Sequence, residues 1–549
     1  MLFDQADGFA EIFKGFLPYY LLVVFPILII MSPMNPVEAS HEFSVYRMQQ
    51  YDLHTVPHGC RSATFNLEGR SLTSWSTSRH CVVGNIQDIT IDQFVEIRKR
   101  AGALLLVLPK NDTLLTQEEK EHIYLLEMAM IQEEINIPVY FAKWSPDFDD
   151  MIKDLQHSRI TDEKSGTALE AMFNTVSSNG YQIVVSAPNP QKLESKAVSF
   201  HGKLVGRSGT PTIVVAAHYD ASSMIPDLSY GADSNASGAV ALLELARIFS
   251  RLYSSPSVRG GPTLVFALMS TGHSLNYFTT KKWLEEQLDN ADSSLLQDVS
   301  FVMCLDSLSS EGLVTHVSKP PKPSTAAHSL HTRLGSARLN HKKINLADEL
   351  LAWHHERFSI RRMTAFTLSS LQSHKDASRS SILDSPREDA LRHLVDNIRT
   401  IGRALASHIY NITDEVNDED AALYDDALSV EETSVKQWYN YLASQSRSPH
   451  VVTVANQDAG VNSALELAMS RYMEVTTSVH AVDKREPEYV LYGTTRATLY
   501  VYSVKPAVFD LILTLAIGAY LTLVYFAIQV FPQFYTEYAK VVTGKEKVY

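Results

Sequence analysis

An uncharged apolar segment near the C-terminus constrains this chain more than any other feature. Residues 511–531, LILTLAIGAYLTLVYFAIQVF, contain no charged side chain. As an α-helix they would extend about 31 Å, enough to cross the hydrocarbon core of a bilayer. Lysines recur in the short segment that follows, and the positive-inside rule then favours a cytoplasmic C-terminus. We predict a transmembrane helix at 506–532 and a cytoplasmic tail at 533–549.

A second apolar segment lies close to the N-terminus. Residues 15–37 are apolar but interrupted by Pro18 and Pro26, and small residues follow shortly after. This pattern is typical of a secretory signal sequence, and an uncleaved signal anchor is the alternative. We assign 1–41 to this segment. Either interpretation places residues 42–505 across the membrane from the C-terminal tail.

Glycosylation sequons and cysteines fit a secretory compartment. The sequons begin at Asn111, Asn235 and Asn411, which we take as candidate glycosylation sites. Cys60 and Cys81 are flanked by polar residues, and we predict a disulfide between them. The alternative is that all three cysteines, Cys304 included, are free thiols. The net charge of −14 and the absence of a basic cluster in the sequence argue against a nucleic-acid partner.

Residues 42–168 are predicted to form a small N-terminal α/β unit. The apolar runs 101–109 and 137–144 are typical of strands, and the segment between them has apolar residues at helical spacing. Thr116 is the predicted N-cap of that helix. Two strands with a helix between them, at this length, predict a parallel β–α–β unit.

Residues 169–413 alternate apolar strands with amphipathic helices on a larger scale. Strands that are apolar throughout predict a mostly parallel sheet with helices on both faces, an α/β fold. Residues 414–449 are predicted to be an acidic linker and a helix, and residues 450–505 a small β module next to the membrane. The lumenal part would therefore hold three units.

Polar side chains follow two of the predicted strands. His218 and Asp220 end one apolar run and Asp306 ends another. The carboxyl ends of parallel strands are where such sheets place their sites. The loop YGADSNASG then opens a long helix. This order resembles the M28 family of zinc aminopeptidases, over about residues 170–412.

The resemblance implies a zinc site, but several of its ligand positions are altered. His218 and Asp306 match ligands, whereas the bridging Asp falls on Ser234 and the Glu-Glu pair falls on Gly272 and His273. The last His ligand has no clean counterpart, His374 being a weak candidate. A neutral Ser cannot offset the repulsion of two Zn²⁺ ions, and Gly has no side chain to act as a general base.

We therefore predict no catalytic residue, no bound metal and no cofactor. Two alternatives remain open. One is a membrane-bound metallopeptidase with a single zinc on His218, His273 and Asp306. The other is a peptide receptor that uses the old cleft without cleaving.

Within this superfamily the chain resembles the nicalin family, which is nicastrin-like and catalytically degenerate. The segments that carry this resemblance are YGADSNASGAVALLELARIF, SHKDASRSSILD and RATLYVYSV, together with the C-terminal membrane helix. The resemblance implies a single-pass endoplasmic reticulum membrane protein without enzymatic activity. It also implies a complex with the nodal modulator protein and transmembrane protein 147, association with the translocon that handles multipass membrane proteins, and antagonism of Nodal signalling.

Overall fold

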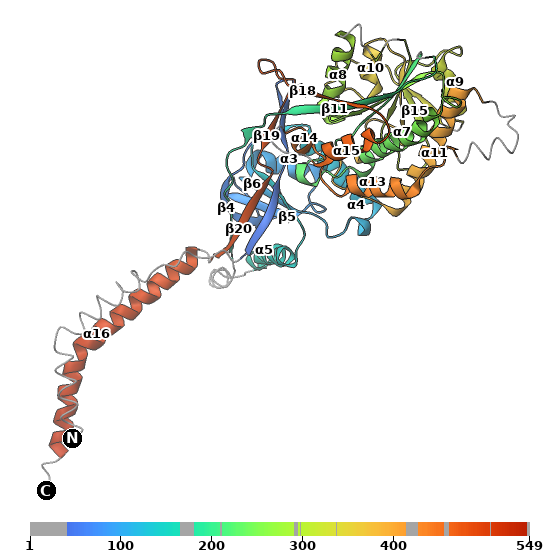
Figure 1. Cartoon of the computed structure of the whole chain (residues 1–549). Helices are drawn as coiled ribbons and strands as arrows, with labels where there is room; N and C mark the ends of the chain where they lie inside the picture. The colour runs from blue at the N-terminus through green and yellow to red at the C-terminus, as the bar shows by residue number, and fades with distance from the viewer. Residues whose placement is uncertain are drawn as a thin grey trace.

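The computed structural model describes residues 41–164, 180–208, 211–289, 295–296, 298–335, 337–412, 427–454, 460–504 and 507–545. These residues form a globular body and one long helix, α16 (Ala507–Lys545), that extends away from it (Figure 1). The predicted signal segment 1–41 lies, except for its last residue, outside the described residues.

The larger part of the body is built on an eight-stranded sheet. Its order is β16 (Arg338–His341), β15 (Val314–Val317), β17 (Ala365–Ser369), β14 (Val299–Leu305), β12 (Thr212–His218), β13 (Thr263–Met269), β11 (Lys196–Leu204) and β18 (Val475–Ala481). The central strands β17, β14, β12 and β13 pair in parallel, and antiparallel pairs lie toward the edges. The predicted mostly parallel α/β fold is therefore confirmed.

Helices cover both faces of this sheet because its strands are apolar on both. Val215 and Ala217 of β12 face one core cluster, while Val214 and Ala216 face the other. The first cluster is covered by α7 (Gly238–Ser254), α9 (Ala326–Arg333), α11 (Glu388–Tyr410), α13 (Glu432–Ala443) and α15 (Gly460–Ser470). The second is covered by α8 (Phe278–Asp289) and α10 (His355–Ile360).

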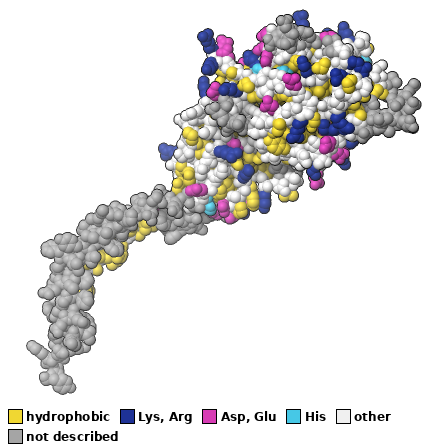
Figure 2. Space-filling view, viewed as in Figure 1, with side chains coloured by type: hydrophobic (Ala, Val, Ile, Leu, Met, Phe, Trp, Pro, Cys, Tyr) yellow, Lys and Arg dark blue, Asp and Glu magenta, His cyan; other side chains and the backbone are white. Residues whose placement is uncertain are grey.

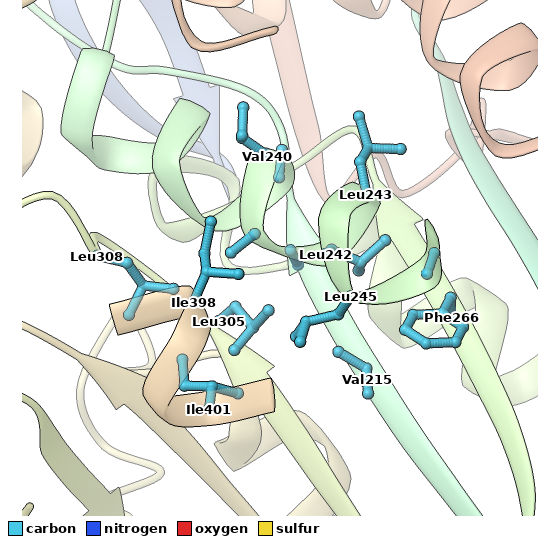
Figure 3. Close-up of a cluster of buried hydrophobic side chains, with 14 of the residues drawn as sticks. Val215, Val240, Leu242, Leu243, Leu245, Phe266, Leu305, Leu308, Ile398 and Ile401 are labelled. Carbon is cyan, nitrogen blue, oxygen red and sulfur yellow. The ribbon is translucent and has the colours of Figure 1, made fainter. Parts of the chain in front are cut away.

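The apolar stripe of α7 explains how the first cluster closes. Leu242 and Leu245 are three residues apart and fully buried against β12, β13 and β14 (Figure 3). Ile398 and Ile401 of α11 meet them from the neighbouring helix. This packing fixes the strand ends that carry the site.

The smaller part of the body is a closed seven-stranded barrel. Its order is β1 (His41–Arg47), β20 (Arg496–Val504), β9 (Gly180–Val185), β4 (Phe65–Ser71), β5 (His80–Asn85), β6 (Ala103–Val107) and β8 (Val139–Ala142). The predicted β–α–β unit is confirmed, since β6 pairs with β8 in parallel and α4 (Gln117–Ile131) connects them. Thr116 caps α4 in a capping box with Glu119. Helices α3 (Ile91–Arg100) and α5 (Pro146–Lys164) also belong to this part.

The C-terminal strands correct the prediction of a separate β module at residues 450–505. Strands from residues 450–505 join three different sheets instead of forming a separate module. β18 pairs with β11, β20 pairs with β1 and β9, and β19 (Tyr489–Gly493) pairs with β2 (Gln50–Leu53) beside β3 (Val56–Cys60), β7 (Glu134–Ile135) and β10 (Gln191–Lys192). A helix predicted within residues 414–449 is present as α13, which buries Val435, Tyr439 and Leu442 in the core of the larger part, whereas residues 414–426 of the predicted acidic linker lie outside the described residues. The short α14 (Pro449–Val452) follows it.

The predicted Cys60–Cys81 disulfide is wrong for this structure. Both thiols are free and fully buried, and they belong to different core clusters of the smaller part. Cys60 Sγ lies against the backbone of Ser62 and Val139, 3.1 and 3.3 Å away. The side chain of Cys81 points to the other side of β5 from Val82, which shares the Cys60 cluster.

Helix α16 contains the predicted membrane segment. Residues Asp510–Glu537 form a span of 28 residues, long and apolar enough to cross a membrane, and its most apolar stretch is not buried against the rest of the protein. Pro532 lies within the helix. On the face shown in Figure 2, the globular body carries interspersed acidic and basic side chains instead. The predicted transmembrane helix is thus supported as a candidate span.

Candidate functional site

The carboxyl ends of three adjacent strands meet as the sequence predicts. His218 is the last residue of β12, Asp306 follows β14, and Gly272 lies three residues after β13. Because β12 pairs in parallel with both neighbours, these ends share one edge of the sheet. The structure therefore brings His218, Gly272 and Asp306 together.

His218 is held between two carboxylates. Its Nδ1 lies 3.0 Å from Asp220 Oδ1 and its Nε2 lies 3.6 Å from Asp306 Oδ2. Burial alone would lower the pKa of His218, but the hydrogen bond to Asp220 and the nearby Asp306 carboxylate outweigh it and raise that pKa to about 9. The ring is therefore a cation at neutral pH.

Arg379 completes this cluster and was not predicted from the sequence. It lies on the short 3₁₀ turn η5 (Ala377–Ser380), and its Nη2 donates to Asp306 Oδ2 and to the Tyr277 hydroxyl. Its Nη1 donates to the carbonyl of Ala352 at 2.8 Å, and the guanidinium stacks over the Trp353 ring, 4.5 Å from its centroid. These partners hold a cation against the carboxylate that matches a metal ligand.

The charge balance of Asp306 depends on this arginine. Burial would raise the pKa of Asp306, but the Arg379 cation and the nearby His218 ring hold it well below its usual range. Ser307 donates its hydroxyl to Asp306 Oδ1 at 3.0 Å. Both oxygens of Asp306 are thus engaged by groups of the protein itself.

Ser234 presents no carboxylate to the cluster. It lies in the turn Ala232–Ser237, where its backbone N–H and that of Asp233 donate to the two oxygens of Asp384, each at 2.8 Å. The carboxylate of the neighbouring Asp233 accepts hydrogen bonds from the Ser237 hydroxyl and from the Ser309 N–H. Burial, then the nearby Asp233 charge, raise the pKa of Asp384 to about 7.

Gly272 has no room for a side chain. A Cβ placed there would lie 2.4 Å from His218 Nδ1 and 2.8 Å from Asp220 Oδ1. The space that a general base would need is occupied by the His218–Asp220 pair. The absence of a base at this position is therefore built into the packing.

His273 does not join the cluster. It is partly buried beside Tyr277, with ring centroids 6.4 Å apart, and it lines a different hollow of about 900 Å³ together with His316, His341 and His374. Burial, then the Arg379 cation, lower the pKa of His273 to about 3. No three His, Cys, Asp or Glu side chains within the described ranges are arranged to hold a metal ion. The alternative single zinc site on His218, His273 and Asp306 gains no support.

The predicted glycosylation site at Asn235 is wrong for this structure. Asn235 is fully buried, and its Nδ2, the atom that would carry a glycan, donates to the carbonyls of His218 and Leu305 at 2.9 and 3.0 Å. Its Oδ1 accepts from the Gly238 and Ser307 N–H groups. Asn235 therefore ties the site loop to β12 and β14. Asn111 and Asn411 are exposed, and their glycosylation remains a prediction.

The old cleft is still hollow beside this cluster. A cavity of about 730 Å³ lies between α4 and residues 383–389, which lead into α11, and Ser234, Ser307 and Arg379 form part of its wall. Its wall carries both acidic and basic side chains, including Lys120, Asp384 and Arg387. The described side chains therefore leave room for a ligand, although the groups that would act on one are engaged with each other.

The protonated ring of His218 leads to a pH prediction. Its pKa is higher in the folded chain than the ordinary 6.5, so its stabilising contribution is complete below about pH 6.5 and is lost as pH rises through about 9. Between these values we expect the free energy of unfolding of the native chain to fall by about 3 kcal/mol more than that of His218→Gln. Urea unfolding across this range tests it, and His393→Gln on α11 should follow the native chain. Parallel profiles for His218→Gln and the native chain would contradict a charged His218.

The sheet, the strand-end His and Asp, and the turn that opens α7 define a protein with an M28 peptidase-like fold. Residues 200–338 match the model of Peptidase family M28. An aminopeptidase from Aneurinibacillus sp. strain AM-1 is 12% identical, with a TM-score of 0.29, over 68% of this chain and 83% of that one.

Seven relatives match nearly the whole chain, and two of them illustrate the range of identity. The BOS complex subunit NCLN of Canis lupus familiaris is 40% identical over 545 residues, covering 95% of this chain and 94% of that protein. Nicalin of Caenorhabditis elegans is 30% identical over 537 residues, covering 92% and 94%. The chain belongs to the nicalin family, whose members include the BOS complex subunit NCLN, and the resemblance predicted from the sequence is confirmed.

Proposed function

We propose that this chain is a non-catalytic subunit of a membrane protein complex, with the M28-like domain serving as a scaffold. The observation that carries the proposal is the ion-pair cluster of His218, Asp306 and Arg379. His218 Nδ1, His218 Nε2 and Asp306 Oδ2 each face a charged group of the same chain, and Asp306 Oδ1 accepts a hydrogen bond from Ser307. Displacing Arg379 to admit a metal would leave a buried guanidinium without its carboxylate partner, which is strongly unfavourable.

The proposal extends to location and partners through the nicalin family. The chain would be a single-pass protein of the endoplasmic reticulum membrane, with its body in the lumen and its C-terminus in the cytoplasm. Its partners would be the nodal modulator protein and transmembrane protein 147, and the assembly would act with the translocon on multipass membrane proteins. The resemblance to this family would also link the chain to antagonism of Nodal signalling. The printed name of the relatives, a BOS complex subunit, and the candidate span in α16 support membership of a membrane complex.

One purification tests this proposal with two readouts. The full chain, recovered from its native membrane by a C-terminal tag, is expected to carry both partners and less than about 0.1 zinc per chain. Replacing residues 511–531 by an unrelated apolar helix of equal length should reduce recovery of transmembrane protein 147, because close helix packing needs particular side chains.

The outcomes separate the proposal from the metallopeptidase alternative. One tightly held zinc that disappears in His273→Ala, together with peptide hydrolysis, would establish the altered single-zinc enzyme instead. If a well-folded chain recovered neither partner, the proposal that it is a subunit of this complex would be rejected. Unchanged recovery after the helix replacement would place the partner contacts in the body.

A further inference from the structure

A basic groove lies on the larger part of the body, away from the cluster described above. It encloses about 570 Å³ and is lined by four cationic side chains, Lys319, Lys322, Lys343 and Arg362. No acidic side chain among the described residues lines it. The remaining polar lining consists of hydroxyls, contributed by Ser318, Thr325, Ser359 and Thr364.

The fold brings these cations together from three separate segments. Lys319 and Lys322 follow the end of β15, and Lys343 follows the end of β16, which runs parallel to β15. Arg362 precedes the start of β17, which runs antiparallel to β15, so it reaches the same edge. The Lys342 N–H donates to the Val317 carbonyl at 3.0 Å and holds two of these segments side by side.

The proline pattern of the first segment fixes the direction of its lysines. In the sequence KPPKP, residues 319–323, every position is either a proline or a residue that precedes one. Proline fixes φ, and the residue before a proline is restricted to extended conformations, so this segment favours a polyproline II path. That path has three residues per turn, which puts Lys319 and Lys322 on one face, and both indeed line the groove.

The groove cations are electrostatically unopposed. None of the four forms an ion pair with a described Asp or Glu, whereas the adjacent Lys342 and Arg361 are paired with Asp348 and Glu285. Thr325, on the rim, is the N-cap of α9, so the positive end of that helix dipole lies beside the groove. On a chain with a net charge of −14, this groove is a local region of positive potential.

We propose that this groove docks an acidic segment of a partner protein on the same side of the membrane as the globular body. The apolar part of its lining favours a peptide over a small anion, because the prolines, Ile344 and Met363 place apolar surface between the cations. Side chains flanking each carboxylate of a peptide can pack on that surface. α9, α10 and β15 lie at the end of the body farthest from α16, so the groove is distant from the candidate membrane span, which favours a protein over membrane headgroups as its occupant (Figure 1). The groove makes no use of the cluster at His218, so the inference stands without the proposed function.

The test uses the full chain in detergent micelles and a fluorescein-labelled peptide of alternating Glu and Ala. The native chain should bind this peptide with an affinity that falls as salt is raised, because exposed charges are screened. Reversing three groove cations, in Lys319→Glu/Lys322→Glu/Lys343→Glu, should weaken binding by about tenfold or more. The matched control is Lys192→Glu/Lys203→Glu/Lys436→Glu, which changes the charge equally at exposed lysines elsewhere and should retain the native affinity.

Three results would overturn the inference. The first is no peptide binding by the native chain at low salt. The second is an equal loss of affinity in the control variant, since the peptide would then respond to overall charge. The third is tighter binding of inorganic pyrophosphate than of the peptide with the same dependence on the groove lysines, which would make the groove a small-anion site. Unfolding midpoints of both variants, expected to equal that of the native chain, establish that affinity and not folding has changed.

Discussion

Replacement of Arg379 by methionine is expected to lower the free energy of unfolding by about 3–5 kcal/mol. Methionine keeps an unbranched apolar side chain at this position but removes the guanidinium, which lies over Trp353 and pairs with Asp306, so the Asp306 carboxylate stays buried without its nearest cation. Asp306 is fully buried and Arg379 is 5% exposed, so water cannot replace the lost partner. Urea unfolding of the full chain in micelles, followed by tryptophan fluorescence, measures the change, because all five tryptophans lie outside the membrane segment.

A second substitution separates the lost charge pairing from lost packing. Adding Asp306→Asn to Arg379→Met removes the unpaired charge and should restore part of the lost stability, so the two effects should not add. Arg399→Met is the control, since Arg399 on α11 pairs with Asp396 at an exposed site, and its loss should cost no more than about 1 kcal/mol. If Arg379→Met were as mild as Arg399→Met, the guanidinium would not be what stabilises this cluster.

The sequence predicted those parts of the site that depend on local patterns. His218 and Asp306 directly follow runs of apolar residues, and parallel pairing of those runs brings their ends to one edge. Ser234 and Gly272 were recognised as altered by their place in an ordered pattern. Arg379 carries no such signal, because it lies 73 residues after Asp306 on a turn whose position depends on tertiary packing.

The errors also come from non-local pairing. Local β-propensity identified strands in residues 475–504, but the partner of each strand is set by packing across the chain, and the three strands went to three sheets. Cys81 follows the alternation of β5 and faces away from the Cys60 cluster. The sequence around Asn235 is a valid sequon, yet the Asn235 side-chain amide donates hydrogen bonds to the carbonyls of two strands. The basic groove was not predicted from the sequence for the same reason, since its cations come from three separate segments.

Gly272→Ala, the smallest possible addition at the position of the missing general base, is expected to destabilise the fold by about 1–3 kcal/mol. The new Cβ would meet His218 Nδ1 at 2.4 Å and Cε1 at 2.7 Å, closer than such atoms approach in proteins. His218 cannot yield easily, because its ring is held by Asp220 and Asp306. The matched control is Gly402→Ala in α11, where the Cβ would lie 3.5 Å from Leu245 and the helix would gain from alanine.

The double variant Gly272→Glu/Ser234→Asp tests whether restoring the two altered carboxylates restores a zinc peptidase site. We expect this variant to be less stable than Gly272→Ala and to bind less than about 0.1 zinc per chain, because the larger side chain must displace the His218–Asp220 pair and Arg379 still neutralises Asp306. Urea unfolding and elemental analysis of the purified variant provide the two readouts. A stable variant that binds zinc and hydrolyses peptides would show that only the two altered residues separate this chain from an enzyme. If the variant still bound no zinc after Arg379→Met was added, the altered ligand positions and Arg379 together would not account for the loss of the metal site. The fold would then be maintained independently of the catalytic centre.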